Sequence, residues 1–134
     1  MFSISREFGF CYGHRLLNHA GKCRRLHGHN GRVRVTLSSD SLNDAGMVRD
    51  FSDLKETLGG WIDRTLDHRT LLDQSDPLRE RLESAGEQVV AFDGAPTAER
   101  LAKLIFDQAA AEGFPVQRVE FWETEKCRAV YEKE

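Results

Sequence analysis

HGHNGRVRVTLSS, residues 27–39, is the stretch of sequence that decides the fold. From Gly31 onward it alternates, with two valines and Leu37 on one side and polar residues on the other. Alternation with a period of two predicts a strand with one buried face. Just before this strand, His27 and His29 are two positions apart, so in an extended chain both imidazoles point to the same face.

Three more strands and two helices are expected around this strand. The segment from Phe2 to Phe10 also alternates, which predicts a strand that precedes it. Apolar residues then recur at helical spacing in two segments, and two short apolar runs near the end of the chain predict strands. These four segments are Leu54 to Leu66, Leu101 to Ala109, Val116 to Trp122 and Ala129 to Tyr131.

The ends of the two helices carry recognisable signals. Ser52 and Thr97 are expected to be the N-caps, and Gly113 is expected to end the second helix. The adjacent glycines Gly59 and Gly60 in the first helix indicate close packing against another element, or a kink. The predicted order is strand-strand-helix-helix-strand-strand, which is an α+β fold with both helices on one face of a four-stranded sheet.

The outer strands of such a sheet are open edges, and joining sheets between subunits is one way to manage them. The element order alone therefore indicates an oligomer.

Composition and length limit the class of protein. The chain has 134 residues, of which 40% are hydrophobic and 31% charged, so residues 1–134 are expected to form one globular domain. No apolar run is long enough to span a membrane, and the N-terminal residues lack the pattern of a signal peptide. With three cysteines at irregular spacing, a disulfide framework is not expected. We expect a cytoplasmic protein that does not bind membranes.

The charges are distributed unevenly. From Phe8 to Ser39 there is no acidic residue, but there are six basic residues and four of the five histidines. A basic block within an acidic chain indicates either an anionic ligand bound at one place or a positive face that balances an acidic one. Nucleic acid is not expected as a partner, because the net charge is −3 and no basic recognition motif is present.

A third histidine strengthens the case for a metal site. His14 ends the first predicted strand, and a hairpin between the first two strands would bring it back towards His27 and His29. Three histidines with an open fourth position are typical of catalytic zinc. The alternative is three histidines that bind no ligand.

Two further groups could transfer protons. Cys23 lies in a run of cations that favour the thiolate form, although it could instead be a fourth zinc ligand or inert. Those cations are Lys22, Arg24 and Arg25. Asp67 and His68 could exchange protons with Cys23 if they lie close in space, or could simply be a polar pair at a helix end. Cys11 and Cys127 lie in predicted strands and are expected to be small core residues.

Taken together, these residues resemble the 6-pyruvoyltetrahydropterin and 6-carboxytetrahydropterin synthase family. The matching elements occur in the family's order and extend over nearly the whole chain. They are Phe10 with His14-Arg15-Leu16, Cys23-Arg24-Arg25-Leu26-His27-Gly28-His29-Asn30, Gly46-Met47-Val48-Arg49-Asp50-Phe51, Leu66-Asp67-His68, Pro96-Thr97-Ala98-Glu99, and Glu123-Thr124 before Tyr131.

The resemblance implies the tunnelling fold, a four-stranded antiparallel sheet with two helices on one face (ββααββ), and sheets that join between subunits into barrels. It also implies a homohexamer, a dimer of trimers, with active sites between subunits. By resemblance, the zinc ligands are His14, His27 and His29, and the catalytic residues are Cys23, Asp67 and His68. Glu123 would anchor the pterin, Thr97 would make a further pterin contact, and Lys22, Arg24 and Arg25 would hold a triphosphate.

The spacing favours one branch of the family. Three residues separate Cys23 from His27, as in 6-carboxytetrahydropterin synthases, which act in queuosine biosynthesis. The implied substrate is 7,8-dihydroneopterin triphosphate, with loss of triphosphate and acetaldehyde. The alternatives are the pyruvoyl reaction, in which only triphosphate is lost, and a zinc-dependent pterin binder without catalysis.

Three features depart from the family pattern. Gly31 stands where an aromatic residue usually follows the histidine motif. The run Phe10-Cys11-Tyr12-Gly13 stands where small residues usually precede the first histidine. Arg100 replaces a common asparagine. The first two features flank the expected metal site and bear on how substrate is bound there.

Overall fold

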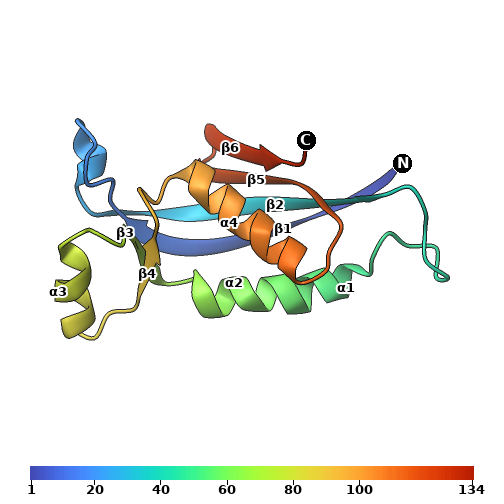
Figure 1. Ribbon diagram of the computed structural model, residues 1–134, viewed down its shortest axis with the longest axis horizontal. Helices are drawn as coiled ribbons and strands as arrows, with labels where there is room; N and C mark the ends of the chain where they lie inside the picture. Colours follow the sequence, from blue (N-terminus) through green and yellow to red (C-terminus); the bar gives the residue numbers. More distant parts are fainter.

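A long antiparallel hairpin forms the centre of the computed structural model, which describes residues 1–134 (Figure 1). It consists of β1 (Phe2–His14) and β2 (His27–Ser39), paired without interruption from Phe2 opposite Ser39 to His14 opposite His27. Both strands alternate between buried and more exposed residues, as the period-two pattern predicts. This register places the first and second expected metal ligands directly opposite each other.

The hairpin is extended on both sides into a six-stranded sheet, ordered β4-β3-β1-β2-β5-β6. On one side, β5 (Val116–Thr124) and β6 (Cys127–Glu132) continue the antiparallel pairing, so the predicted four-stranded sheet is confirmed. On the other side lie two short strands that were not predicted. The first pairs parallel to β1, and the second pairs parallel to the first. They are β3 (Arg69–Asp73) and β4 (Val89–Phe92).

The two predicted helices cover one face of the sheet (Figure 1). The first is continuous through α1 (Phe51–Leu54), the π-helical turn η2 (Lys55–Gly59) and α2 (Gly60–Thr65). Its N-cap is Asp50, two residues earlier in the chain than the predicted Ser52, because the Asp50 carboxylate accepts the Ser52 backbone N–H at 2.9 Å.

The glycine pair in this helix allows close packing on the sheet. A Cβ atom at Gly59 would lie 3.0 Å from Cε1 of Phe8 on β1, so a larger residue would push the helix away from the strand. The adjacent glycines thus mark the close packing that the sequence indicated, and the π-helical turn η2 lies at the same place.

The second predicted helix is α4 (Ala98–Ala111), which packs on β5 and β6. Thr97 is its N-cap and accepts the Arg100 N–H at 3.3 Å, as expected, while Gly113 follows its end with φ of 87°. Between the helices lie a short helix, α3 (Leu78–Ser84), and β4. A short 3-10 turn, η1 (Lys22–Arg24), lies in the loop that joins β1 to β2.

The core lies between the sheet and the two main helices. It is built from the inward residues of the central strands and the apolar stripes of the helices, and it includes Val33, Val35, Leu37, Leu54, Leu58, Ile62, Leu101, Ile105, Val119 and Phe121. No helix is long and apolar enough to cross a membrane.

The expectation that Cys11 and Cys127 are core residues is not met. Cys127 is exposed because it begins β6, the outermost strand of its side of the sheet. Cys11 is only half-buried, since its neighbours on β1, Phe10 and Tyr12, take the core-facing positions.

Candidate metal centre

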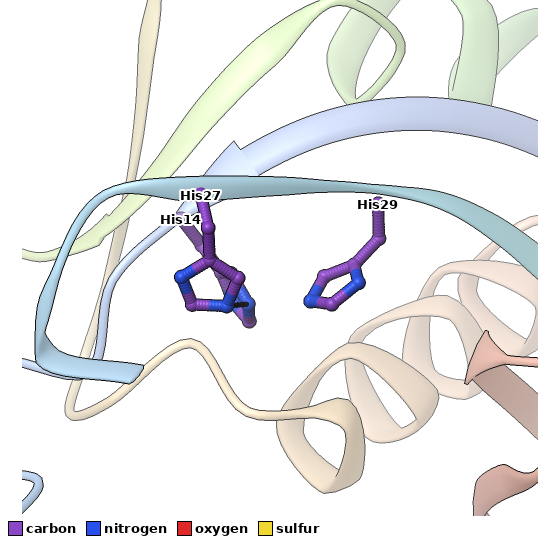
Figure 2. Close-up of side chains that lie close together, drawn as sticks. All are labelled: His14, His27 and His29. Carbon is purple, nitrogen blue, oxygen red and sulfur yellow. Dashed lines mark hydrogen bonds between the residues drawn. The ribbon is translucent and has the colours of Figure 1, made fainter. Parts of the chain in front are cut away.

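Three histidine side chains converge at the end of the β1–β2 hairpin that the connecting loop closes. His27 and His29 extend from the same face of β2, and His14 reaches them from the end of β1, so all three point towards the segment before α4 (Figure 2). One nitrogen from each ring lies within 4.8 Å of the other two. The hairpin therefore brings together the three residues that the sequence singled out as metal ligands.

Backbone carbonyls orient two of these rings. Nδ1 of His14 lies 2.9 Å from the Pro96 carbonyl, and Nδ1 of His27 lies 2.7 Å from the Arg25 carbonyl. A carbonyl can only accept, so in both rings Nδ1 carries a proton and Nε2 is the nitrogen left to bind a metal. This is the arrangement by which second partners orient metal-binding histidines.

The donor set fits a zinc ion. Nε2 of His14 and Nε2 of His27 are 3.1 Å apart, close to the roughly 3.3 Å that separates two nitrogens bound tetrahedrally at about 2.0–2.1 Å from zinc. Nε2 of His29 is buried and has no hydrogen-bond partner. Such an orphaned acceptor is costly unless a ligand satisfies it. Three imidazoles with a free coordination position match a catalytic zinc site.

Burial also favours the neutral form of two of these rings, His14 and His29. Burial lowers the pKa of His14 to about 4, and the charges that would form on His27 and His29 act in the same direction, against the Pro96 carbonyl. Burial likewise lowers the pKa of His29, partly offset by Glu123. At neutral pH both rings are available to bind a metal, because only the neutral imidazole has a free lone pair.

Glu123 lies beside the histidines, near the end of β5. Its two carboxylate oxygens are 3.9 Å from Nε2 of His14 and 4.0 Å from Nε2 of His29, and about a quarter of its side chain is exposed. A carboxylate in this position can accept hydrogen bonds from a ligand that also contacts the metal. Tyr12 packs beneath the cluster, with its ring 5.2 Å from His14 and 5.6 Å from His29 between centroids.

A second cluster joins Asp67 and His68 to Cys11. Oδ1 of Asp67 accepts the Cys11 N–H at 3.1 Å, the His68 N–H donates to the Cys11 carbonyl at 2.7 Å, and Sγ of Cys11 is 3.5 Å from the His68 ring nitrogens. Oδ2 of Asp67 contacts Nδ1 of His68 at 3.0 Å. Burial raises the pKa of Asp67, but hydrogen bonds from Cys11 and the His68 ring outweigh it and hold that pKa below its usual value.

His68 is held in an unusual backbone conformation. Its φ of 60° is the only positive value at a non-glycine residue of the chain. Strain of this kind persists only where the surroundings enforce it, and it clusters at functional sites. Its side chain is about three-quarters exposed, so the ring is presented to solvent at the end of the α2 helix. Within one chain, the thiol that contacts this pair is Cys11 and not Cys23.

Cys23 lies in η1, half-buried, at the same end of the sheet as the histidines. Its carbonyl accepts the Leu16 N–H at 2.9 Å, which ties the loop back to the end of β1. The cations around it, Lys22, Arg24 and Arg25, are exposed and form no ion pair. Arg15 is different: it is bound to Asp76, whose carboxylate accepts Nε at 2.8 Å and also contacts the rest of the guanidinium.

Known proteins resemble this chain along nearly its whole length. The family model for 6-pyruvoyl tetrahydropterin synthase matches residues 3–134. This chain belongs to that family. A relative in Synechocystis named 6-carboxy-5,6,7,8-tetrahydropterin synthase is 40% identical over 136 residues, covering 98% of this chain and 93% of the relative. One of the same name in Rickettsia bellii is 31% identical, covering 95% and 97%.

Solved structures agree on the fold. A protein of Wolinella succinogenes described as uncharacterized superposes with a TM-score of 0.80 at 32% identity, covering 99% of this chain and 98% of that one. The 6-pyruvoyl tetrahydropterin synthase of Caenorhabditis elegans superposes with a TM-score of 0.73 at 24% identity, over 99% and 96% of the two chains. The α+β fold of the synthase family is thus confirmed for this chain.

Sequence reasoning missed two residues beside the candidate site. Cys11 was expected in the core, but it contacts both Asp67 and His68. Tyr12 was noticed only as a departure from a run of small residues, whereas its ring lies against two of the three histidines. The signal that could have found Tyr12 is its place two residues before His14, on the same face of a strand.

Thr97 is also near the cluster, one residue after the carbonyl that orients His14. Its hydroxyl oxygen accepts a hydrogen bond from the start of α4, which leaves its O–H free to donate to a ligand.

Proposed function

We propose that this chain is a zinc-dependent lyase that converts 7,8-dihydroneopterin triphosphate to 6-carboxy-5,6,7,8-tetrahydropterin, with loss of triphosphate and acetaldehyde. The observation that carries the proposal is the convergence of three imidazoles beside Glu123, in a chain alignable nearly end to end with relatives of that name. The reaction would supply the 7-deazaguanine precursors of queuosine.

His14, His27 and His29 would hold the metal through Nε2, with Nδ1 of the first two kept in place by carbonyls. When bound, zinc would polarise the side-chain oxygens of the substrate and acidify the adjacent C–H bonds. Glu123, which faces the same space, would accept hydrogen bonds from the donor edge of the pterin ring.

Binding of the rest of the substrate falls to two other groups. Thr97 would donate to the ring from the start of α4. The exposed cations Lys22, Arg24 and Arg25 have no acidic partner and would hold the triphosphate, for which unpaired positive charge is required. Arg15 is not assigned to this task, because Asp76 already neutralises it.

Proton transfer is assigned to Cys23, Asp67 and His68. The thiolate of Cys23 would remove or return protons at the substrate carbons, His68 would exchange protons with it, and Asp67 would orient the His68 ring, which it contacts at 3.0 Å. Because Asp67 and His68 contact Cys11 within their own chain, we infer that they meet Cys23 of a second copy. The active site would then need two subunits.

This assignment requires an oligomer, for which we propose a homohexamer of two trimers in the cytoplasm. The edge strands β4 and β6 leave unpaired backbone groups, and joining sheets into a barrel would satisfy them. Light scattering should give about six times the monomer mass of 15.3 kDa. A stable and active monomer at low protein concentration would contradict the shared site.

Product analysis tests the reaction. The zinc-loaded protein is incubated with 7,8-dihydroneopterin triphosphate, the pterin products are separated and weighed by mass spectrometry, and acetaldehyde is trapped as its hydrazone. We expect a pterin with a one-carbon carboxyl side chain, one acetaldehyde per turnover, and neither in the His29→Ala variant. A product that keeps the three-carbon side chain would identify the pyruvoyl reaction instead. Tight binding without any product would identify a pterin binder.

A further inference from the structure

The hydroxyl of Tyr12 is a buried polar group without a partner. The residue is 4% exposed, and its oxygen has no hydrogen bond within the chain. Buried hydroxyls are nearly always hydrogen-bonded, so an orphaned one indicates a partner that arrives with a ligand or a rearrangement. Tyr12 lies between the core and the metal centre, with its ring against Phe10 and Phe121 on one side and His14 and His29 on the other.

Gly31 explains how a residue as large as tyrosine fits there. A Cβ atom at Gly31 would lie 3.1 Å from Cε1 of Tyr12 and 2.7 Å from Cζ of Phe121. The tyrosine ring thus occupies the space above β2 that a side chain at position 31 would take. Tyr12 and Gly31 are therefore complementary: the ring on β1 fills the space that the missing side chain on β2 leaves.

The space at Gly31 also gives the Tyr12 ring a defined direction. Tyr12 pairs with His29 across the hairpin, and Phe10 pairs with Gly31. Because Cε1 of Tyr12 is next to the carbon that bears the hydroxyl and lies over Gly31, the ring leans across β2 towards β5. Glu123 lies near the end of β5 on the side of the histidines.

Among the polar groups near this ring, Glu123 is the one able to accept. Nε2 of His14 and Nε2 of His29 face the metal position, and Nδ1 of His14 is engaged by the Pro96 carbonyl. The Glu123 carboxylate has only its two long contacts with histidines, at 3.9 and 4.0 Å.

We propose that Tyr12 is a positioning residue for pterin binding: its hydroxyl donates a hydrogen bond to the Glu123 carboxylate and fixes it towards the donor edge of the ligand. Tyr12 acts through Glu123 and does not touch the reacting atoms. The inference rests on the proposed function, since it takes Glu123 as the pterin anchor. It adds a residue to the site, because the phenol reaches this position only where position 31 lacks a side chain.

The test is the Tyr12→Phe variant, which keeps the ring and removes only the hydroxyl. Binding of 7,8-dihydroneopterin triphosphate is measured by calorimetry in a Cys23→Ala background, so that turnover does not interfere. We expect the Kd to rise by about tenfold or more, as for a lost hydrogen bond to a charged group. Zinc content and the urea midpoint should not change. In the otherwise wild-type enzyme KM should rise by the same factor, with kcat changed less than about twofold.

Tyr131→Phe is the matched control, because Tyr131 is the only other tyrosine and packs on Phe106, on β6. It should bind substrate as the parent does. An unchanged Kd in Tyr12→Phe overturns the inference. If the parent itself does not bind the pterin, the proposed function fails instead, so the two failures are distinguishable.

A double-mutant cycle decides whether Tyr12 acts through Glu123. In a Glu123→Ala background the Tyr12→Phe change should have no further effect on Kd. If its full effect persists there, the hydroxyl contacts the ligand directly, and positioning through the carboxylate is refuted.

Discussion

The buried imidazole of His14 should make the metal-free protein sensitive to mild acid. The folded state keeps this ring neutral, because burial lowers its pKa from the ordinary 6.5 to about 4. The unfolded chain takes up a proton below about pH 6.5 and the folded protein does not do so until near pH 4. Between these values the unfolded state binds more protons, so the free energy of unfolding falls as the pH falls.

The size of the effect follows from the two pKa values. At about 1.4 kcal/mol per pH unit, the full difference is ~3 kcal/mol, and about 2 kcal/mol of it is lost between about pH 7 and pH 5. This window is informative because carboxylates titrate mostly below it. His14 is 1% exposed, so little of the effect is screened by solvent. Burial lowers the pKa of His29 as well, which adds to the loss in the same direction.

The assay is urea unfolding of the metal-free protein, followed by tryptophan fluorescence at fixed protein concentration. The variant is His14→Asn, whose side-chain amide can still donate to the Pro96 carbonyl but cannot be protonated in this range. Between about pH 7 and pH 5, the free energy of unfolding of this variant should fall by about 2 kcal/mol less than that of the parent. His19→Gln is the control, because His19 is exposed in the loop after β1 and should leave the pH dependence unchanged. Equal pH dependence in parent and His14→Asn would refute the reasoning.

Three other predictions concern the site and its support. Elemental analysis should find one zinc per subunit, with a sharp loss in His29→Ala. Cys23→Ala should keep all of its zinc, because the thiol is assigned to proton transfer. Loss of zinc from Cys23→Ala would indicate that the thiol is a fourth ligand. His68→Ala should bind substrate nearly normally but turn over very slowly. Glu123→Ala should bind substrate about 1.5–3 kcal/mol more weakly. Calorimetry and single-turnover rates on folded oligomers would measure both effects. Asp76→Ala should lower the free energy of unfolding, measured by urea denaturation, by roughly 3–5 kcal/mol, because it leaves the Arg15 guanidinium without its fully buried partner. A change below about 1 kcal/mol would show that the pair contributes little.

The sequence predicted the elements that have a strong period. The β1–β2 hairpin and the antiparallel strands after α4 show clear alternation or apolar runs, and the helices have caps and stripes. The parallel strands β3 and β4 were missed because they are five and four residues long. A parallel strand is stabilised by pairing with a distant segment, here with β1, and a run this short carries no period that could announce it.

The candidate site was predicted in the same uneven way. The metal ligands were found because their spacing and the hairpin register are local properties of the chain. The contacts of Asp67 and His68 were not, since Cys11 is more than fifty residues away and its position on the outward side of β1 depends on how the strand is packed. The place of Tyr12 depends on a missing side chain at Gly31, which is visible only once the two strands are set side by side.

Because His14 pairs directly with His27, the positions of the metal ligands do not depend on the length of the segment between these two residues. The loop of residues 15–26 closes the hairpin at the end where the ligands lie, so extra residues there would lengthen the loop without moving either strand. One residue inserted into β2 between His29 and Val33 would instead turn the strand over and send two of the three imidazoles to the opposite face. The register of the metal ligands should therefore tolerate changes of length at residues 17–21 of this loop, where new substrate contacts could be grafted, whereas residues 22–25 hold the proposed proton-transfer and triphosphate groups and the carbonyl that orients His27.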